Sequence, residues 1–349
     1  MPAIHRLLAR NARSLIARCA IVIVAASSLV GHSIALAQTA SQTKTIYLSP
    51  KGSDSASGAS ADTAVATLQK AIDRAQGLLD QKEGRVEIAV GRGRYMNQVA
   101  TLDSVKANKA LTLRADCQGD TCAVFDGSNQ GRWLSVKYAP GGGGTLEIRG
   151  LTIVDYLWGI VVSGSRDDTT HNVTHVSIVD NEFRRIGQPD PRAQFSTGAI
   201  VFINVDDSRI ERNHFSDIRN KVQCVHLHGV YMAHGSSDNV IRSNTFERGC
   251  GDAIRLRDGS GNNKIAQNVF VDFWASAPVS EWYCESKSRD DCTKDTPECP
   301  SFGNVLSNNR MERKSLKPVP MTATFGADDK KACGGRPAGA KRFLDSAQR

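Results

Sequence analysis

The sequence of 349 residues has few aromatic residues and no long apolar run, and both absences narrow what the chain can be. Phe, Trp and Tyr make up 6% of the residues, which is little for a non-catalytic glycan-binding or adhesive protein with exposed aromatic platforms. The main apolar run, Cys19 to Val30, has only about a dozen residues. It is too short to span a bilayer.

Basic clusters and metal-binding cysteine pairs are also missing. No group of Lys and Arg interleaves with aromatic residues along one face, so the footprint of a nucleic-acid-binding protein is absent. No CxxC pair is matched by a second pair, which argues against a zinc site. The formal charge is +8, and it falls to +4 without the four arginines of residues 1–37. Such mild basicity suits an anionic ligand.

Residues 1–37 have the pattern of a secretory signal peptide. A segment with four arginines precedes the apolar run, and Ala35-Leu36-Ala37 is a small-x-small cleavage site. We therefore predict a mature start near Gln38, an exported protein that is periplasmic or secreted, and no stable membrane insertion after cleavage. An N-terminal membrane anchor is the alternative.

Export makes disulfides the expected state of the eight cysteines that remain after Cys19 is removed. Sequence alone leaves about 105 pairings open. Cys117 with Cys122 is the obvious local bridge, and Cys224 with Cys250 is the obvious bridge between neighbouring repeats. A disulfide-tied loop or terminal cap is predicted from the other four: Cys284, Cys292, Cys299 and Cys333.

An internal repeat organises the centre of the chain. HGVYMAHGSSDNVIRSNTF (228–246) and DAIRLRDGSGNNKIAQNVF (252–270) align without a gap over nineteen positions, six of them identical. TGAIVFINVDDSRIERNHF (197–215) aligns as a further copy, and VSIVDNEF is a looser one. Successive Asn-x-Phe units are 32, 31 and 24 residues apart. Each unit is therefore predicted to form one turn of a solenoid.

The apolar positions within each repeat alternate with period two, which predicts strands. Val230 and Met232 in one copy align with Ile254 and Leu256 in the next, between turns rich in Gly, Asn, Asp and Ser. Such strands stack in parallel, rung on rung. We expect the repeated Asn side chains to pair as ladders and the repeated Phe side chains to fill one interior layer.

These features resemble the right-handed parallel β-helix of the pectate-lyase-like superfamily. TIYLSPKGSDSASG followed by ATLQKAIDRAQGLL is similar to the opening of such proteins, in which an extended segment leads into a helix that caps the first coil. Leu68, Ile72, Ala75 and Leu79 fall on one face of that helix.

The resemblance implies an all-β chain with one β-helix domain over residues 38–312. The domain is divided into an opening strand and capping helix (44–80), repeated coils (about 110–312) and a loop insertion (275–303). A C-terminal tail over residues 313–349 follows.

Residues that differ between repeats are the candidates for chemistry. The gapless alignment stacks Thr197/His228/Asp252, Ile200/Tyr231/Arg255, Phe202/Ala233/Arg257 and Ile203/His234/Asp258. Because Val230, Met232, Ile254 and Leu256 are the inward set, the side chains between them should point outward. Inward Val225 and Leu227 would leave His226 and His228 facing outward too.

This cluster suits acid–base chemistry on an acidic polysaccharide or oligosaccharide. Elimination from a uronate needs a cation for the carboxylate, a base for the C5 proton and an acid for the leaving oxygen. Arg255 suits the cation, and His228 or His226 suits the base, with Asp252 as its orienting group. Tyr231 suits the acid, or the base if Arg255 favours its phenolate. Substrate contacts are expected from Arg257, Lys221, His234 and Asp258.

Three alternatives remain open beside a polysaccharide lyase. A uronate C5-epimerase shares the first step. A glycoside hydrolase is disfavoured because NVDD, LHG and RLR only partly match the polygalacturonase motifs, and hydrolysis needs two carboxylates, for which only Asp252 and Asp258 are aligned. The third is a non-catalytic glycan-binding protein, in which the His–Asp and Tyr–Arg stacks are plain surface contacts.

Calcium is common in pectate lyases, but the repeats carry no compact Asp/Glu set. We therefore predict no metal and no other cofactor, and a monomer.

Overall fold

The computed structural model describes residues 43–81, 83–115, 117, 122–192, 196–284, 298–312, 319–325, 333 and 341–345. The predicted signal peptide and Cys292 lie outside these residues. All described elements belong to one compact unit, Ser41–Arg349. Within the described ranges, none of the helices has the length and apolarity needed to cross a membrane.

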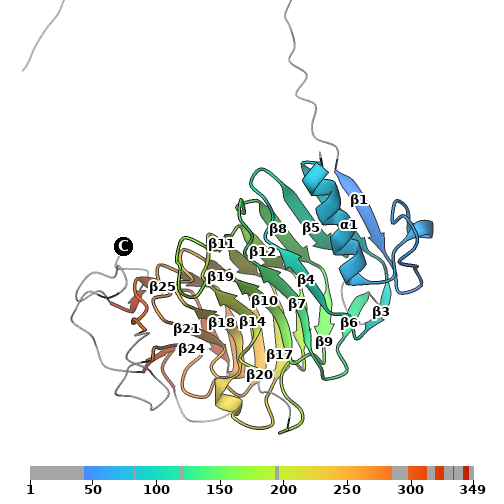
Figure 1. Cartoon of the computed structure of the whole chain (residues 1–349). Coiled ribbons are helices and arrows are strands. Elements are labelled where there is room, and N and C mark those ends of the chain that lie inside the picture. The colour runs from blue at the N-terminus through green and yellow to red at the C-terminus, as the bar shows by residue number, and fades with distance from the viewer. Residues whose placement is uncertain are drawn as a thin grey trace, which may run out of the picture. The chain divides into compact units, whose positions relative to one another are not determined.

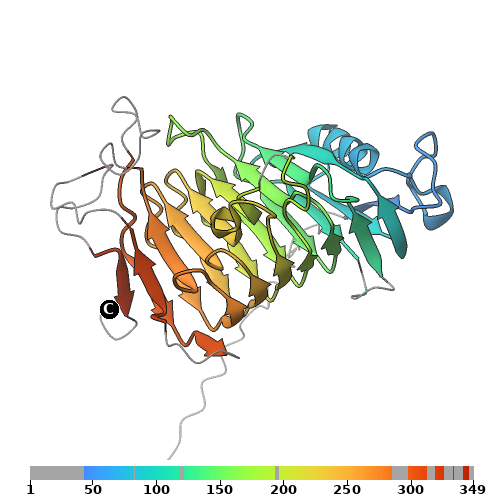
Figure 2. The same ribbon diagram turned by 90° about the horizontal axis from the view of Figure 1, so that it is seen from below.

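Nearly all described elements are short strands that pair in parallel and form three long sheets (Figures 1 and 2). Sheet A contains, in spatial order, β1 (Lys44–Leu48), β2 (Arg85–Val90), β5 (Ala110–Arg114), β8 (Thr145–Arg149), β12 (Val176–Val179), β16 (Arg209–Glu211), β19 (Val240–Arg242), β22 (Lys264–Ala266), β25 (Asn304–Ser307) and β28 (Phe343–Asp345).

The other two long sheets follow the same order along the solenoid. Sheet B contains β3 (Gly93–Met96), β6 (Ala123–Asp126), β9 (Thr152–Val154), β13 (Glu182–Arg184), β17 (His214–Ile218), β20 (Thr245–Gly249), β23 (Val269–Phe273) and β26 (Arg310–Glu312). Sheet C contains β4 (Ala100–Asp103), β7 (Arg132–Lys137), β10 (Trp158–Ser163), β14 (Gly198–Ile203), β18 (His228–Ala233), β21 (Ile254–Arg257), β24 (Val279–Trp282) and β27 (Thr322–Thr324). A two-stranded sheet pairs β11 (Val173–Thr174) with β15 (Val205–Asp206).

The chain therefore winds repeatedly through the three sheets as a parallel β-helix, and the predicted fold is confirmed. The helix α1 (Leu68–Gln81) contacts β1, β2 and β4 at the N-terminal end of the solenoid (Figure 1). Its buried face consists of Leu68, Ala71, Ile72, Ala75 and Leu79, which includes all four residues that the sequence placed there. Two short 3-10 helices, η1 (Ala61–Thr63) and η2 (Cys224–His226), complete the elements of the described residues.

Stacks of identical side chains fill the interior, as the repeat predicts. The rings of Phe183, Phe215, Phe246 and Phe270 stack in sequence, with centroid distances of 5.1, 4.7 and 5.3 Å.

The predicted Asn ladders are present at two turns. The side-chain amide of Asn213 donates to Asn244, and that of Asn244 donates to Asn268, at 3.1 and 3.0 Å. A second ladder joins Asn239, Asn263 and Asn304 in the same way. Because these amides satisfy buried backbone groups as well as one another, they hold successive turns in register.

The predicted register is right between β18 and β21 and wrong between β14 and β18. Tyr231 lies beside Arg255, as expected, but its partner in β14 is Val201 and not Ile200. The turn that contains His234 and Gly235, both at positive φ, is one residue longer than the turn after β14. A gapless alignment cannot show an extra residue of this kind.

The coils do not end where the sequence suggested. β24 lies inside the segment predicted to be a loop insertion (275–303), and β27 and β28 lie inside the predicted tail (313–349). Coils also begin earlier than residue 110, since β2 pairs with β1. Near the C-terminal end, the buried carboxylate of Glu281 accepts a hydrogen bond from Arg342 at 2.8 Å, which ties the last described segment to the solenoid.

The structure contains both disulfides that the sequence singled out, Cys117–Cys122 and Cys224–Cys250. A third bridge joins Cys299 to Cys333, which confirms that cysteines tie the C-terminal region together. The Cys224–Cys250 bridge fastens η2 to the segment that precedes β21.

Candidate functional site

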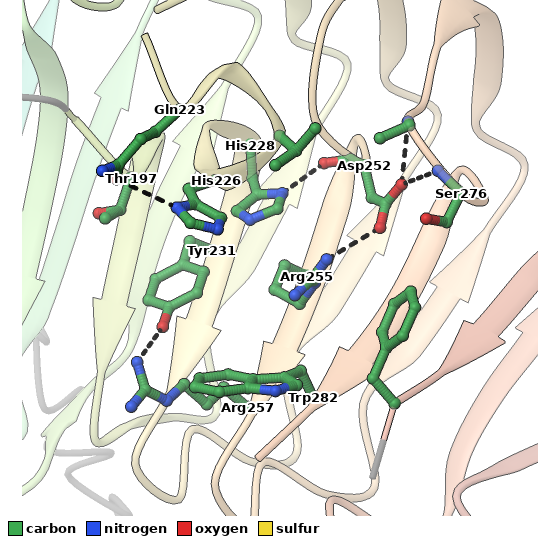
Figure 3. A pocket seen from close by; sticks show the side chains of 13 residues that line it. Thr197, Gln223, His226, His228, Tyr231, Asp252, Arg255, Arg257, Ser276 and Trp282 are labelled. Carbon is green, nitrogen blue, oxygen red and sulfur yellow. Dashed lines mark hydrogen bonds and ion pairs between the residues drawn. The ribbon is translucent and has the colours of Figure 1, made fainter. Parts of the chain in front are cut away.

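The outward face of sheet C carries a pocket of about 670 Å³ over β18, β21 and β24 (Figure 3). The strands supply its floor, and η2 and the segments around residues 275 and 325 supply its sides. Its lining consists of Thr197, Gln223, Val225, His226, His228, Tyr231, Asp252, Arg255, Arg257, Ala275, Ser276, Trp282 and Phe325.

A corner at the start of β18 sets the directions of the two floor rings. A Cβ on Gly229 would lie 2.7 Å from ring carbons of Phe246, so this position faces the interior and only glycine fits there. His228, before the corner, and Tyr231, after it, both face the pocket. Their rings are nearly parallel, with centroids 5.6 Å apart.

The backbone fixes the tautomer of His228. Its Nδ1 lies 2.7 Å from the carbonyl oxygen of Asp252, and a carbonyl only accepts, so Nδ1 carries the proton. Burial of the ring, together with the positive charge of Arg255, lowers the pKa of His228 to about 3. His228 is therefore neutral near pH 7, with an unprotonated Nε2 that no described residue hydrogen-bonds.

Asp252 does not orient His228 through its carboxylate, contrary to the prediction. One carboxylate oxygen accepts from the backbone N–H groups of Ala275, Ser276 and Ala277 at 3.0, 2.7 and 3.1 Å. The other accepts from Arg255 at 2.9 Å. Burial alone would raise the pKa of Asp252, but these hydrogen bonds and the nearby cation lower it overall, so Asp252 is ionised.

Arg255 is held firmly while part of its guanidinium stays available. Its Nε donates to the hydroxyl of Ser280 at 2.6 Å, and Nη2 donates to Asp252. The guanidinium also lies 5.4 Å from the ring centroid of Phe325. No described residue accepts a hydrogen bond from Nη1. A preorganised cation with a free donor therefore lines the pocket beside Tyr231.

Arg257 supports Tyr231 and is already paired. It binds both carboxylate oxygens of Glu298, stacks 4.5 Å from the ring centroid of Trp282, and donates to the Tyr231 hydroxyl at 2.9 Å. Burial lowers the pKa of Arg257, but Glu298 and Tyr231 more than reverse this effect and leave the pKa raised. Because the Tyr231 oxygen accepts from Arg257, its own O–H is directed to another acceptor.

Six of the nine predicted site residues line this pocket: His226, His228, Tyr231, Asp252, Arg255 and Arg257. Lys221, His234 and Asp258 do not. Lys221 is exposed before η2, and the side chains of His234 and Asp258 bond each other at 2.7 Å at the turns that follow β18 and β21. Val225 is 52% exposed and not inward as predicted, because it lies in η2 and not in a strand.

One described cluster has the composition of a metal site. Ligand atoms of His234, Asp258 and Glu298 lie within 4.8 Å of one another. Arg257 already binds both oxygens of Glu298, and the backbone N–H of Cys299 donates to Asp258. These cationic and N–H partners do not fit a cation site, so we derive no metal chemistry from it.

The sequence missed several residues in and around the site, among them Ser280, Trp282, Glu298 and Phe325. Ser280 occupies the same outward row as Tyr231 and Arg255, in register across β21 and β24. The inward neighbour of Ser280 and Trp282 is the charged Glu281, which interrupts the apolar alternation that would have marked the strand. The outward positions of VSEW could have been found only by counting from Val279.

Comparison with known proteins identifies the fold. The profile of a family described as right handed beta helix region matches residues 118–282. The crystal structure of an alginate lyase from Paenibacillus sp. str. FPU-7 is similar with a TM-score of 0.53 and 14% identity, over 87% of this chain and 98% of that chain.

A pectate lyase, Pel9A, is similar with a TM-score of 0.43 and 10% identity, over 84% and 83% of the two chains. No curated protein matches. The chain has the fold of a right-handed parallel β-helix.

Proposed function

We propose that this protein is an exported polysaccharide lyase that cleaves an acidic, uronate-containing polysaccharide by β-elimination. The observation that carries the proposal is the convergence of Arg255, the neutral His228 and Tyr231 on one pocket. The similar fold of a protein named as an alginate lyase agrees with a carbohydrate substrate. The disulfides agree with export.

Each of the three side chains has one role. Arg255 binds the uronate carboxylate and withdraws charge from it, which makes the C5 proton more acidic. His228 accepts that proton on Nε2, with Nδ1 held by the Asp252 carbonyl. Tyr231, positioned by Arg257, donates its proton to the leaving oxygen.

Hydrolysis fits the pocket less well. Asp252 is the one carboxylate in the described lining, and both of its oxygens already accept hydrogen bonds. A glycoside hydrolase needs one carboxylic acid and one carboxylate on either side of the scissile bond. Elimination needs no carboxylate from the protein, so the lining suits a lyase better.

The test is the ultraviolet absorbance of unsaturated uronate after incubation of the chain from Gln38, with disulfides formed, with acidic polysaccharides. We expect absorbance to rise with the unaltered chain and to fall by about 1,000-fold in rate for Arg255→Ala. Arg209→Ala is the matched control, because Arg209 forms comparable polar contacts on sheet A, with Ser177 and Glu147. Its rate should stay within about threefold of the unaltered chain.

Other outcomes would contradict the proposal. New reducing ends without absorbance would indicate a hydrolase. Exchange of the C5 proton without cleavage would indicate an epimerase. A similar loss in Arg209→Ala would mean that general destabilisation, and not the pocket, explains the effect of Arg255→Ala.

A further inference from the structure

We infer that the elimination is syn, so that the substrate is a polymer whose C5 hydrogen and C4 glycosidic oxygen lie on the same side of the sugar ring. This inference rests on the proposed function and adds the stereochemical class of the substrate. It follows from where the proton-transferring side chains lie in the pocket.

The two groups assigned to proton transfer come from the same strand and the same side of the pocket. His228 and Tyr231 are three residues apart in β18, and their nearly parallel rings have centroids 5.6 Å apart (Figure 3). Arg255 lies on the adjacent rung, directly beside Tyr231. A sugar ring resting on this floor therefore presents one face to the base, the acid and the cation together.

An anti elimination needs the base and the acid on opposite faces of the sugar ring. The side of the pocket opposite the floor has few described side chains that could act as either. Among the described lining residues outside the floor of sheet C, His226 in η2 is the one that carries an imidazole, and Asp252 is already held by its hydrogen bonds. His226 is exposed, and its Nδ1 contacts Gln223 at 3.4 Å. The geometry thus favours transfer of both protons on one face.

The proton transfers and bond changes of the syn elimination balance with His228 as the base and Tyr231 as the acid. The base takes the C5 proton, the electron pair of the broken C–H bond forms the C4=C5 double bond, and the C4–O bond breaks. The leaving oxygen takes the Tyr231 proton. His228 then carries an extra proton and Tyr231 lacks one, so loss of the first proton to solvent and uptake of a proton from solvent by Tyr231 restore the starting state.

The relative orientation of the C5 hydrogen and the C4 oxygen in each uronate decides which polymers can undergo syn elimination. In 1,4-linked D-mannuronate and D-glucuronate, the C5 hydrogen and the C4 oxygen are cis. In 1,4-linked D-galacturonate and L-guluronate they are trans. A floor that holds both proton-transferring groups therefore selects polymannuronate or a 1,4-glucuronan over polygalacturonate and polyguluronate.

The experiment compares initial rates of unsaturated-product formation on these four polymers at equal uronate concentration. We expect the rate on at least one cis polymer to exceed the rates on both trans polymers by about 100-fold or more. Equal or faster elimination on a trans polymer would overturn the inference while leaving the lyase proposal intact. Unsaturated product from none of the four would overturn the lyase proposal, and the inference with it.

A matched pair of variants tests the same point from the protein side. His228→Ala should reduce the rate on the preferred polymer by about 1,000-fold, and His226→Ala by about tenfold or less. Thermal unfolding of both variants shows whether they remain folded. If His226→Ala loses as much as His228→Ala while its melting temperature is unchanged, the base lies across the ring and the syn assignment is wrong.

Discussion

The inward and outward faces of sheet C are made by the same strands, yet their side chains follow opposite rules. One inward row is buried and apolar through five coils: Ile160, Ile200, Val230, Ile254 and Val279. The adjacent outward row is valine in the first two coils, Val161 and Val201, and then changes at every coil to Tyr231, Arg255 and Ser280. A constant interior fixes the backbone of each rung, so outward residues can vary without moving it.

This difference between the two faces of sheet C explains how a functional site can be confined to two or three coils of a regular solenoid. The polar residues that converge on the pocket floor belong to β18, β21 and β24, whereas β10 and β14 present Val161 and Val201 at the same row. Stability should therefore depend on the inward stacks, and activity on the outward row.

The largest effect on stability is expected inside the solenoid. Phe246 stacks between Phe215 and Phe270 and is fully buried. Phe246→Ala should lower the free energy of unfolding by about 3–5 kcal/mol, because it leaves a cavity in the continuous Phe layer. Denaturant titration measures this loss, and activity per folded molecule should stay within about threefold. A loss below about 1 kcal/mol would show that the stack is not what holds the coils.

The next effect concerns His228 and pH. Its pKa is about 3 when folded and 6.5 for the ordinary group, so between these values the unfolded chain binds more protons than the folded one. Stability should consequently fall as the pH drops through this window, by about 3 kcal/mol from this group between pH 7 and pH 4. Denaturant titrations at both pH values should show a steeper decline for the unaltered chain than for His228→Gln. Parallel declines would contradict the buried neutral histidine.

A smaller loss is expected at the Asn ladder. The amide of Asn244 donates to Ile210 and Asn268 and accepts from Asn213. Asn244→Ala should cost about 2 kcal/mol of unfolding free energy, since buried partners lose their hydrogen bonds. Chemical denaturation measures this cost. An unchanged midpoint would mean that the ladder contributes little beyond the Phe layer.

The smallest effect on stability is expected on the outward row. Tyr231→Phe removes the hydroxyl that accepts from Arg257, at a cost of about 1 kcal/mol in unfolding free energy. The same change should reduce kcat by about 100-fold, because it removes the proposed proton donor. If Tyr231→Phe keeps its full kcat, Tyr231 is not the proton donor. If its melting temperature falls strongly, the outward row contributes to stability as well, contrary to the distinction between the two faces of sheet C.

Most of the fold could be predicted from the sequence because the residues that indicate it recur in each repeat. Asn213, Asn244 and Asn268 recur in step with Phe215 and Phe270, and the structure stacks them as the alignment implied. Counting along the two aligned repeats was enough to predict that Tyr231 and Arg255 lie side by side on the outward face.

The remaining features depend on contacts that do not repeat. The extra turn residue at Gly235 shifts the register by one, and the buried Glu281 is tolerated only because Arg342 and the backbone N–H of Ser301 bind it. The roles of Asp252 and Arg257 also depended on partners in later segments, Ala275 to Ala277 and Glu298. No local pattern predicts such partners.

The most direct test of the central claim is the mass spectrum of the fragments that the chain releases from a purified oligomannuronate of defined length. Elimination adds no water, so the masses of two complementary fragments should sum to the mass of the substrate, and Arg255→Ala should release almost none. Fragment masses that sum to the substrate plus one water molecule would show hydrolysis and contradict the assignment of Arg255, His228 and Tyr231 to β-elimination.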